Sequence, residues 1–529
     1  MKKSISIAAM AATVLLTVLA PAAASGAAAS AFTANKPLFE IHTLAGSGEF
    51  AFREGKGEES AFHQPTSLLA DATSGSLILS DTRNQRIRAI AKDGVSSTLA
   101  GTDWADGEWN LPLGGLNDGK AGESVLNAPG GLAADAKGNI YVADTENHAI
   151  RMLDRAGVLT TIAGNGLIGS ADGQAAQARF YHPLDVAVTT GGVIYVADTL
   201  NHVIRKIEAG IVSTIGKAPE RAILSSEEAE LAGNFADGPI AEAMFNEPSG
   251  LALDTQGNLY VSDTGNQRIR YIDFTKGVVT TVAGGKSGSF PGYGADEAYV
   301  SGDYADGKAS DAKFNSPRGL ALTAEGGLLI ADSLNHVIRY LKDGVVTTLA
   351  GTPGDTGRVD GVASASGFNQ PTDVTWLGNN SFAVADAGNN RISVVKPYAI
   401  PTGLKKGAAI QLLLDQQLVA SDAAPEVTAG TTFVPVRVIT EKLGFTVHYK
   451  AGTTVLTKGD LSYTLTAKSA AIVKTAAGQA VHNVTLPSPA YYNNGRLFVP
   501  VRFFAEEAGL DVQWLSDTGS VLLRHKQFS

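Results

Sequence analysis

The chain has 529 residues, of which 44% are hydrophobic and 18% charged, a composition typical of folded globular domains. Its formal net charge of −10 argues against a nucleic-acid partner held through phosphate contacts. The sequence contains no cysteine, which excludes disulfides, iron–sulfur clusters, thiolate zinc sites and cysteine nucleophiles. Its 59 glycines exceed the usual share of about 7%, so the chain must turn unusually often.

Residues 1–25 have the three parts of a secretory signal peptide. Lys2 and Lys3 form the charged start, an apolar stretch follows, and small residues lead to an expected cleavage site at Ala24. A membrane anchor would need about 20 apolar residues with firm flanks. We therefore expect a secreted or cell-envelope-associated protein with no membrane span in its mature part. Export without cysteine favours a Gram-positive bacterium, and residues 26–38 would form a spacer.

One pattern recurs six times in residues 39–397. It runs Phe-x-x-Pro in most copies, an apolar strand, Gly, a second strand ending in Asp, then x-x-Asn and Ile-Arg. Each copy has about 50 residues plus an insertion, and contains four short β-rich runs between turn residues. The aspartates that end the second strands are Asp81, Asp144, Asp198, Asp263, Asp332 and Asp386. Six repeats of four antiparallel strands predict an all-β, six-bladed β-propeller.

The two ends of this repeat region complement each other. The sixth copy stops at Pro397 without its fourth strand, whereas the region begins with an orphan copy of that strand at 40–46. A ring of blades must remove its open edges. We therefore predict that the N-terminal strand completes the last blade. Deleting 39–46 should then destabilise the ring far more than an ordinary terminal truncation would.

The repeated motifs also resemble a known family. The Asp-Thr-x-Asn-His/Gln-x-Ile-Arg loop and the Val-Thr-Thr-Leu-Ala-Gly strand are similar to those of NHL-repeat propellers, over about two thirds of the chain. The sequence has four tryptophans, and none stands in a repeated Trp-Asp pair, which argues against WD40 repeats. The resemblance implies the same six-bladed ring that the repeat pattern predicts.

In five copies an arginine follows the repeated aspartate by seven positions: Arg88, Arg151, Arg205, Arg270 and Arg339. A residue needed in nearly every blade serves the blade itself. We interpret these aspartates and arginines as structural residues that bond loop backbone and fix the adjacent strand. The sixth copy has Ser393 in place of the arginine, so its aspartate is expected to use Arg391 instead.

Three histidines, His148, His202 and His336, occupy one equivalent loop position. Imidazoles near a propeller mouth could hold zinc. NHL-type propellers include a zinc-dependent amidating lyase with metal histidines in comparable loops, and the resemblance implies three ligands from blades spread around the ring. Here two of the three blades are neighbours and the third is not. In the other copies the position holds Gln85, Gln267 and Asn390. Interchange of His, Gln and Asn favours a hydrogen-bonding loop residue over a zinc ligand.

The connectors between blades should emerge on the same face as the Asp-Thr-x-Asn loops, and insertions of this kind usually map to a binding face. The longest connectors lie at 102–125, 217–244 and 286–313. The last carries Asp296, Asp303 and Asp306, whose carboxylates could collect Ca²⁺. No EF-hand or nonapeptide spacing is present. The Asp306-Gly307 pair recurs in four other copies, which indicates a turn.

After a linker at 398–408, residues 409–526 contain a duplication of their own. The segment 433–437, Phe-Val-Pro-Val-Arg, returns at 498–502. Each copy predicts a strand, a proline at a helix start, a short amphipathic helix and a glycine stop. The doubled pattern resembles the N-terminal stalk domain of some copper amine oxidases, without a counterpart of their catalytic copper domain. We expect a small, non-catalytic α+β module.

The leading hypothesis is a secreted, non-catalytic binding or scaffold protein whose loop face takes a protein, peptide or cell-wall glycan ligand. No catalytic residue and no cofactor is predicted, and no Gly-x-Ser-x-Gly elbow, His-Glu-x-x-His helix or phosphate loop occurs. The alternative is a secreted metal-dependent lyase or hydrolase that uses Zn²⁺ or Ca²⁺ at the channel mouth. The sequence does not indicate an oligomeric state.

Overall fold

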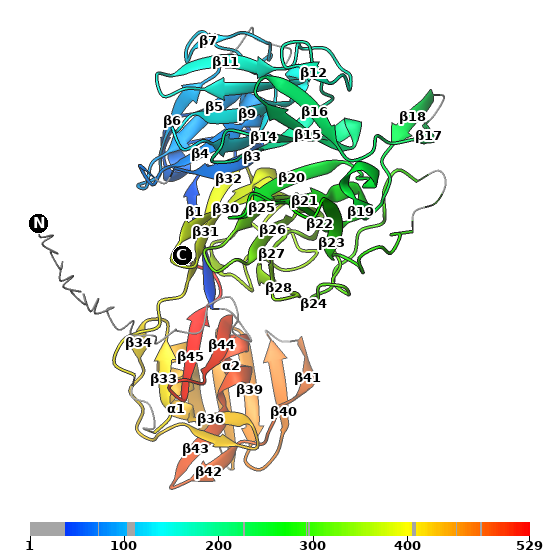
Figure 1. Ribbon diagram of the computed structural model, residues 1–529. Coiled ribbons are helices and arrows are strands. Elements are labelled where there is room, and N and C mark those ends of the chain that lie inside the picture. The colour runs from blue at the N-terminus through cyan, green and yellow to red at the C-terminus, as the bar shows by residue number, and fades with distance from the viewer. Residues whose placement is uncertain are drawn as a thin grey trace, which may run out of the picture.

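The computed structural model describes residues 38–528 except 72, 103–111, 226–227, 293, 295–296, 405–408, 451 and 477–478. The expected cleavage site at Ala24 lies outside these residues. In the described part, six blades surround a central channel, and a smaller C-terminal domain lies beside the ring (Figure 1). No helix of the described residues is long and apolar enough to cross a membrane.

Each blade is a four-stranded antiparallel sheet, and a two-residue strand from the connector extends its outer edge. The first blade contains β2 (Gly55–Lys56), β3 (Pro65–Ala70), β4 (Leu77–Asp81), β5 (Arg86–Ile90) and β6 (Val95–Ala100). The second contains β7 (Gly119–Lys120), β8 (Pro129–Ala134), β9 (Ile140–Asp144), β10 (Ala149–Leu153) and β11 (Val158–Ala163). The third contains β12 (Gly173–Gln174), β13 (Pro183–Val188), β14 (Ile194–Asp198), β15 (Val203–Glu208) and β16 (Ile211–Ile215).

The other three blades repeat this order, and the connector into the fourth adds a hairpin of β17 (Arg221–Ser225) and β18 (Glu228–Ala232). The fourth contains β19 (Gly238–Pro239), β20 (Pro248–Leu253), β21 (Leu259–Asp263), β22 (Arg268–Asp273) and β23 (Val278–Ala283). The fifth contains β24 (Gly307–Lys308), β25 (Pro317–Leu322), β26 (Leu328–Asp332), β27 (Val337–Lys342) and β28 (Val345–Ala350). The sixth contains β29 (Gly361–Val362), β30 (Pro371–Gly378), β31 (Ser381–Asp386), β32 (Arg391–Pro397) and β1 (Phe39–Ala45).

The N-terminal strand β1 closes the ring, as the sequence predicts. It lies between β32 and β29 in the sixth blade, and its Glu40 pairs antiparallel with Lys396 of β32. The first long strand of each blade, such as β3, contacts its equivalents in the two neighbouring blades around the channel. The phenylalanine of the repeated Phe-x-x-Pro motif packs between blades and is fully buried, as at Phe62, Phe180, Phe245, Phe314 and Phe368.

The repeated aspartate and arginine meet inside each blade, and the third blade illustrates the arrangement. Asp198 Oδ1 accepts the backbone N–H of Tyr181 at 2.7 Å, and its Oδ2 accepts Asn201 Nδ2 and Arg205 Nη1, each at 2.7 Å. Arg205 is fully buried and also donates Nη2 to the carboxylate of Asp172 at 2.5 Å. The pair therefore ties the 3₁₀ turn after the second strand to the connector.

The same contacts recur around the ring. The five buried arginines lie 2.5–2.9 Å from their aspartates, at Arg88, Arg151, Arg205, Arg270 and Arg339. In the sixth blade Arg391 Nε donates to Asp386 Oδ2 at 2.9 Å, in the place that Ser393 leaves open. The Asp-Gly pairs of the connectors do more than turn. In the fifth blade Asp306 binds Arg339 and accepts the N–H of Thr348, and Gly307 then begins β24.

The C-terminal domain consists, in its described residues, of three sheets and two helices. The first sheet is β33 (Gln411–Leu414), β34 (Gln417–Leu418), β44 (Leu510–Leu515) and β45 (Ser520–His525). The second is β35 (Glu426–Thr428), β36 (Thr431–Pro435), β42 (Tyr491–Asn493) and β43 (Arg496–Pro500). The third is β37 (Thr446–Lys450), β38 (Thr453–Lys458), β39 (Leu461–Thr466), β40 (Ala471–Ala476) and β41 (Gln479–Thr485).

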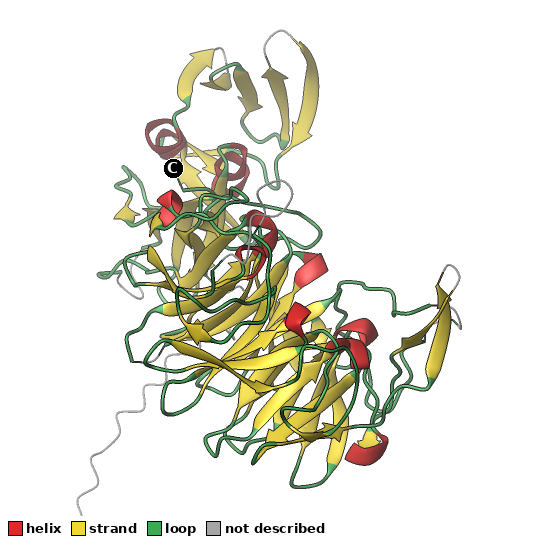
Figure 2. Cartoon of the chain, turned by 90° about the horizontal axis from the view of Figure 1, so that it is seen from above, coloured by secondary structure: helices red, strands yellow, loops and turns green. Residues whose placement is uncertain are grey.

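The duplicated segments fold alike. Each strand, β36 or β43, ends in a proline that leads into a helix, α1 (Val436–Leu443) or α2 (Val501–Glu507). After α1, Gly444 adopts the left-handed backbone (φ 74°) that ends a helix at low steric cost. The two helices contact each other, and both contact β36, which pairs with β43. Figure 2, coloured by secondary structure, shows how few helices accompany the strands of the chain.

The end of the chain runs back onto the closing blade. Beyond β45, Gln527 forms an antiparallel bridge with Gly361 of β29, and Val362 N–H donates to the Lys526 carbonyl at 2.9 Å. The Phe528 ring stacks on His42 of β1, with 5.0 Å between ring centroids. The C-terminal tail therefore covers the outer edge of the blade that the N-terminal strand completes.

Candidate functional site at the channel mouth

The channel mouth is surrounded by six residues with a left-handed backbone, one directly before the first long strand of each blade. These rim residues, with φ between 48° and 57°, are Gln64, Ala128, His182, Glu247, Ser316 and Gln370. The backbone N–H of each donates to a side chain of the preceding blade, over 2.5–3.2 Å. The accepting side chains are Asn390, Gln85, His148, His202, Gln267 and His336.

The histidines that sequence reasoning singled out therefore lie at three separate contacts between blades. His148, His202 and His336 each accept the rim N–H through Nδ1, which requires a neutral imidazole. Burial lowers the pKa of all three, and that of His202 to about 4. The part of the chain that the structure describes brings no three His, Cys, Asp or Glu side chains together in a group able to hold a metal ion.

The aspartates considered for Ca²⁺ have other partners. Asp303 pairs with Lys313, and Asp306 pairs with the buried Arg339 at 2.7 Å. Asp296 lies outside the described residues.

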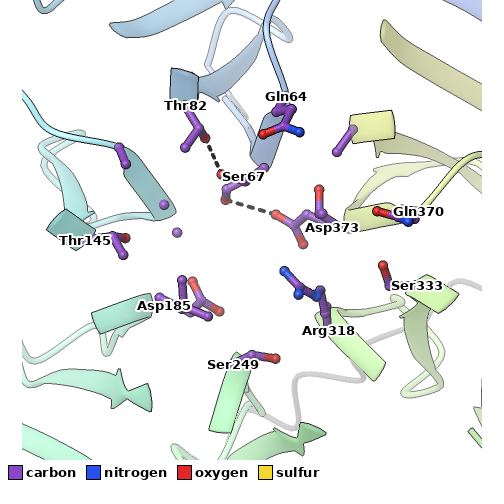
Figure 3. Close-up of a pocket in the computed structure, with 18 of the residues that line it drawn as sticks. Gln64, Ser67, Thr82, Thr145, Asp185, Ser249, Arg318, Ser333, Gln370 and Asp373 are labelled. Atoms are coloured by element: carbon purple, nitrogen blue, oxygen red, sulfur yellow. Dashed lines mark hydrogen bonds between the residues drawn. The ribbon is translucent and has the colours of Figure 1, made fainter. Parts of the chain in front are cut away.

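A pocket of about 320 Å³ opens at the mouth, inside the rim residues (Figure 3). Its walls come from the first residues of the inner strands and from the 3₁₀ turns, so all lining elements belong to the loop face. The lining includes the ionisable side chains of Arg83, Glu146 and His182. It also includes eight hydroxyl groups, at Thr66, Ser67, Thr82, Thr145, Ser249, Ser316, Ser333 and Thr372. Several of these hydroxyls hold neighbouring blades together: Thr145 Oγ1, for example, donates to the Pro183 carbonyl at 2.8 Å.

Two aspartates face the pocket from opposite blades, each at the third residue of its inner strand. Asp185 Oδ2 accepts the N–H of Leu251 at 2.8 Å, and Asp373 Oδ2 accepts the hydroxyl of Ser67 at 2.9 Å. Burial raises the pKa of Asp373 to about 6. Burial also raises the pKa of Asp185 well above its usual range, and the charge of Asp373 adds to that effect. Glycines make room for both, since a Cβ on Gly131 would lie 2.0 Å from Asp185 Oδ1.

Arg318 enters the pocket from the second residue of β25 and points between the two aspartates (Figure 3). Its Nε is buried without a hydrogen-bond partner, and no carboxylate of the described residues forms an ion pair with its guanidinium. Burial lowers its pKa, against the opposing charge of Glu247. Glu247 accepts the hydroxyl of Tyr299 at 2.6 Å. The pocket therefore contains a cation with unused donors.

Exposed apolar side chains gather on the connectors of the same face. They are Phe50, Phe52, Leu113, Leu116, Leu167, Ile168, Leu231, Phe290, Tyr299 and Val359, and we call them the apolar collar. Phe50 is 68% exposed and Leu231 63%. The turns of the opposite face carry fewer large exposed apolar residues within the described chain, at Val95, Ile211, Val345 and Leu377.

Sequence reasoning missed Arg318, Asp185 and Asp373. A signal for them exists in the repeat itself. The second residue of the inner strand is Thr66, Gly130, Leu184, Ser249, Arg318 or Thr372, and the third is Ser67, Gly131, Asp185, Gly250, Gly319 or Asp373. Arg318, Asp185 and Asp373 differ from the residues at the same position in most other blades, and all three line the channel. A structural role shared by all blades therefore does not explain them.

The fold and the pocket at the channel mouth together define the class of protein. It is a six-bladed repeat propeller with a pocket on its loop face, joined to a small accessory domain. Comparison with known families agrees. Residues 126–152, 180–207 and 245–270 match the NHL repeat, and residues 413–523 match the copper amine oxidase N-terminal domain. The chain therefore carries NHL repeats followed by a copper amine oxidase N-terminal domain.

Curated proteins match part of the chain. NHL repeat-containing protein 2 of Homo sapiens is 30% identical over 361 residues, which cover 63% of this chain and 46% of that protein. Teneurin-4 of Mus musculus is 31% identical over 295 residues, 52% of this chain and 10% of its own length. The chain thus spans less than half of these relatives. A crystal structure of an auxiliary nutrient binding protein from Bacteroides thetaiotaomicron is similar over 68% of this chain and 76% of its own (15% identity, TM-score 0.47).

Proposed function

We propose that the protein is a secreted or cell-envelope-associated, non-catalytic binding protein that takes a protein partner on its loop face. The observation that carries the proposal is the apolar collar. Monomeric proteins rarely gather large exposed apolar side chains on one face unless that face meets a partner. Insertions that differ from blade to blade supply these side chains, and variable insertions on a repeat scaffold are where binding surfaces usually form.

The two-domain arrangement supports a scaffold role. Tyr398, directly after β32, packs with Leu413, Leu515 and Leu522 of the C-terminal domain, at the end of the closing blade opposite the loop face. The domain therefore leaves the collar accessible. An envelope-attached module on one side of the ring and a binding face on another would present the ring to a partner.

The test compares two sets of substitutions that remove similar apolar area from opposite faces. One variant carries Phe50→Ser, Leu113→Ser and Leu167→Ser on the collar, and the control carries Val95→Ser, Ile211→Ser and Val345→Ser on the opposite turns. Both are cross-linked to an envelope and culture-medium extract of the source cells. We expect the cross-linked partner to disappear from the collar variant and to persist in the control. Equal cross-linking by both variants would refute the proposal.

The cellular location has its own test. Fractionation of cells expressing the full chain should recover the protein in the medium or envelope, with an N-terminus after Ala24 by mass spectrometry. Full-length protein retained in the cytosol would contradict this part of the proposal.

A further inference from the structure

The pocket at the mouth has a chemical character that the collar does not explain. Arg318 is the one cation at the second position of an inner strand in the six described blades. Burying a guanidinium costs free energy unless its donors are satisfied. Its partner-free Nε faces a pocket large enough for a small molecule. An anionic group of a ligand would accept the hydrogen bonds that the Arg318 guanidinium can donate. A carboxylate can accept two of them side by side, because its two oxygens match the planar geometry of the guanidinium.

The rest of the lining calls for a ligand rich in hydrogen-bond donors. Hydroxyls such as Thr145 already donate to protein carbonyls, so their remaining capacity is mainly as acceptors. Asp185 and Asp373 each accept backbone or hydroxyl donors and add further acceptor oxygens. A ligand that offers several hydroxyl groups satisfies such a surface, whereas an apolar ligand would leave it unpaired.

Charge favours a ligand with a single negative charge. Arg318 stands between Asp185 and Asp373, and the lining also contains Arg83 and Glu146. Two arginines thus face three acidic side chains, and a dianion such as a phosphate monoester would add excess negative charge. Burial raises the pKa of both aspartates, and a protonated carboxyl can donate a hydrogen bond to a neighbouring monoanion. The pocket volume of about 320 Å³ suits one ring-sized polar molecule.

We propose that this pocket binds a polyhydroxylated monocarboxylic acid of the uronic-acid type, with its carboxylate on Arg318 and its hydroxyls on Asp185, Asp373 and the surrounding Ser and Thr side chains. The acid is either a free sugar acid or the end of an acidic polysaccharide, since both present the same group. The site is independent of the protein partner proposed for the collar, because the two use different residues.

The experiment is an isothermal titration of the full-length protein with D-glucuronate and D-glucose, which differ in the carboxylate. We expect glucuronate to bind and glucose to bind at least tenfold more weakly. Arg318→Gln should reduce glucuronate affinity at least tenfold. Arg53→Gln removes an exposed connector arginine that pairs with Glu49 outside the pocket, and it should change the affinity less than twofold. Trigalacturonate binding tighter than galacturonate would identify a polysaccharide end, and equal binding a free acid.

Equal binding of glucose and glucuronate, no binding of either at 50 mM, or glucuronate binding that survives Arg318→Gln would each overturn the proposal. Stronger binding of serine, which pairs a carboxylate with an ammonium group, would overturn the assignment to a hydroxy acid. If Arg318→Gln fails to fold, the comparison of the two sugars on the unaltered protein still decides the question. The collar variants should bind glucuronate normally, so this proposal and the proposed function can fail separately.

Discussion

The Nδ1 atom of His202 accepts a hydrogen bond from the backbone N–H of Glu247 in the next blade, over 3.1 Å. Gln85 makes the equivalent bond to Ala128, and Asn390 makes it to Gln64 across the seam of the ring. Three side-chain types thus perform one task, which is to hold the left-handed residue that begins each inner strand. This contact explains why the repeat tolerates His, Gln or Asn at that position.

The same contact predicts a pH dependence of stability. The pKa of His202 falls from its ordinary value of 6.5 to about 4 in the folded chain. Below about pH 6.5 the unfolded chain therefore binds more protons than the folded one, and the free energy of unfolding decreases as the pH falls toward 4. Replacing His148, His202 and His336 with Gln should remove this loss, on the order of 2 kcal/mol.

The measurement is urea unfolding of wild type and triple variant between pH 4 and pH 7.5. The buried aspartates titrate in both proteins, so the difference between the two curves isolates the histidines. His448→Gln, at an exposed position of the C-terminal domain, serves as the control and should keep the wild-type pH dependence. Superimposable pH profiles for wild type and triple variant would refute the assigned role.

The buried ion pairs predict a large and specific loss of stability. Arg270 and Asp263 are both fully buried, 2.5 Å apart. Arg270→Met should lower the free energy of unfolding by about 3–5 kcal/mol, because it leaves a buried carboxylate without its cation. The double variant with Asp263→Asn should lose less than the sum of the single variants. As the control, Lys276→Met breaks the exposed pair with Asp273 and should lower the free energy of unfolding by under about 1 kcal/mol. Differential scanning calorimetry of all the variants measures these losses.

The closing strand predicts an unequal response to truncation. Removing residues 39–46 exposes the edge of β32 and withdraws Phe39 and Ile41 from the core. We expect a lower melting temperature and rapid proteolysis of the ring. Removing residues 26–37 alone, which keeps Leu38 and its hydrogen bond with Tyr398, should leave both unchanged. An unchanged melting temperature and an intact protease-resistant core after the first deletion would contradict the closure.

Metal analysis tests the alternative of a metal-dependent enzyme. The Nδ1 atoms of His148, His202 and His336 are engaged with backbone, and Asp306 is paired with Arg339. We therefore expect neither Zn²⁺ nor Ca²⁺ in stoichiometric amount in the purified protein. A stoichiometric metal that His202→Ala removes would reverse this expectation and favour the lyase or hydrolase.

The sequence predicts the ring well because its cause is local and repeated. The aspartate, asparagine and arginine of one blade lie within eight residues of each other. The unmatched strand at 40–46 indicates how the ring closes. The pocket could not be predicted in this way. Its charged residues, Arg318, Asp185 and Asp373, come from three different blades. Each differs from the repeat in its own blade, and only the closed ring brings the three side chains to one pocket.

The contact between the C-terminal tail and the sixth blade could not be predicted from the sequence either. Nothing in residues 526–528 resembles a repeat, yet their backbone extends the sheet at Gly361. A Cβ on Gly361 would lie 2.0 Å from the Lys526 carbonyl oxygen, so this contact also depends on a glycine. The glycine is needed because two domains meet there, and a local sequence pattern does not reveal a contact between domains.

The sixth blade combines strands from the two ends of the propeller region, β1 and β29 to β32. Thr43 and Arg391, 348 residues apart, hydrogen bond within it, and Phe528 stacks on His42 of the same strand. As the chain emerges, during synthesis or export, the first five blades can assemble in order, whereas β1 has no partner until the sixth repeat emerges. Ring closure is thus the last step in the assembly of the propeller, ahead of the C-terminal domain that follows it in the chain. A shortened product that ends before the sixth repeat would keep β1 unpaired and would be a target for quality-control proteases.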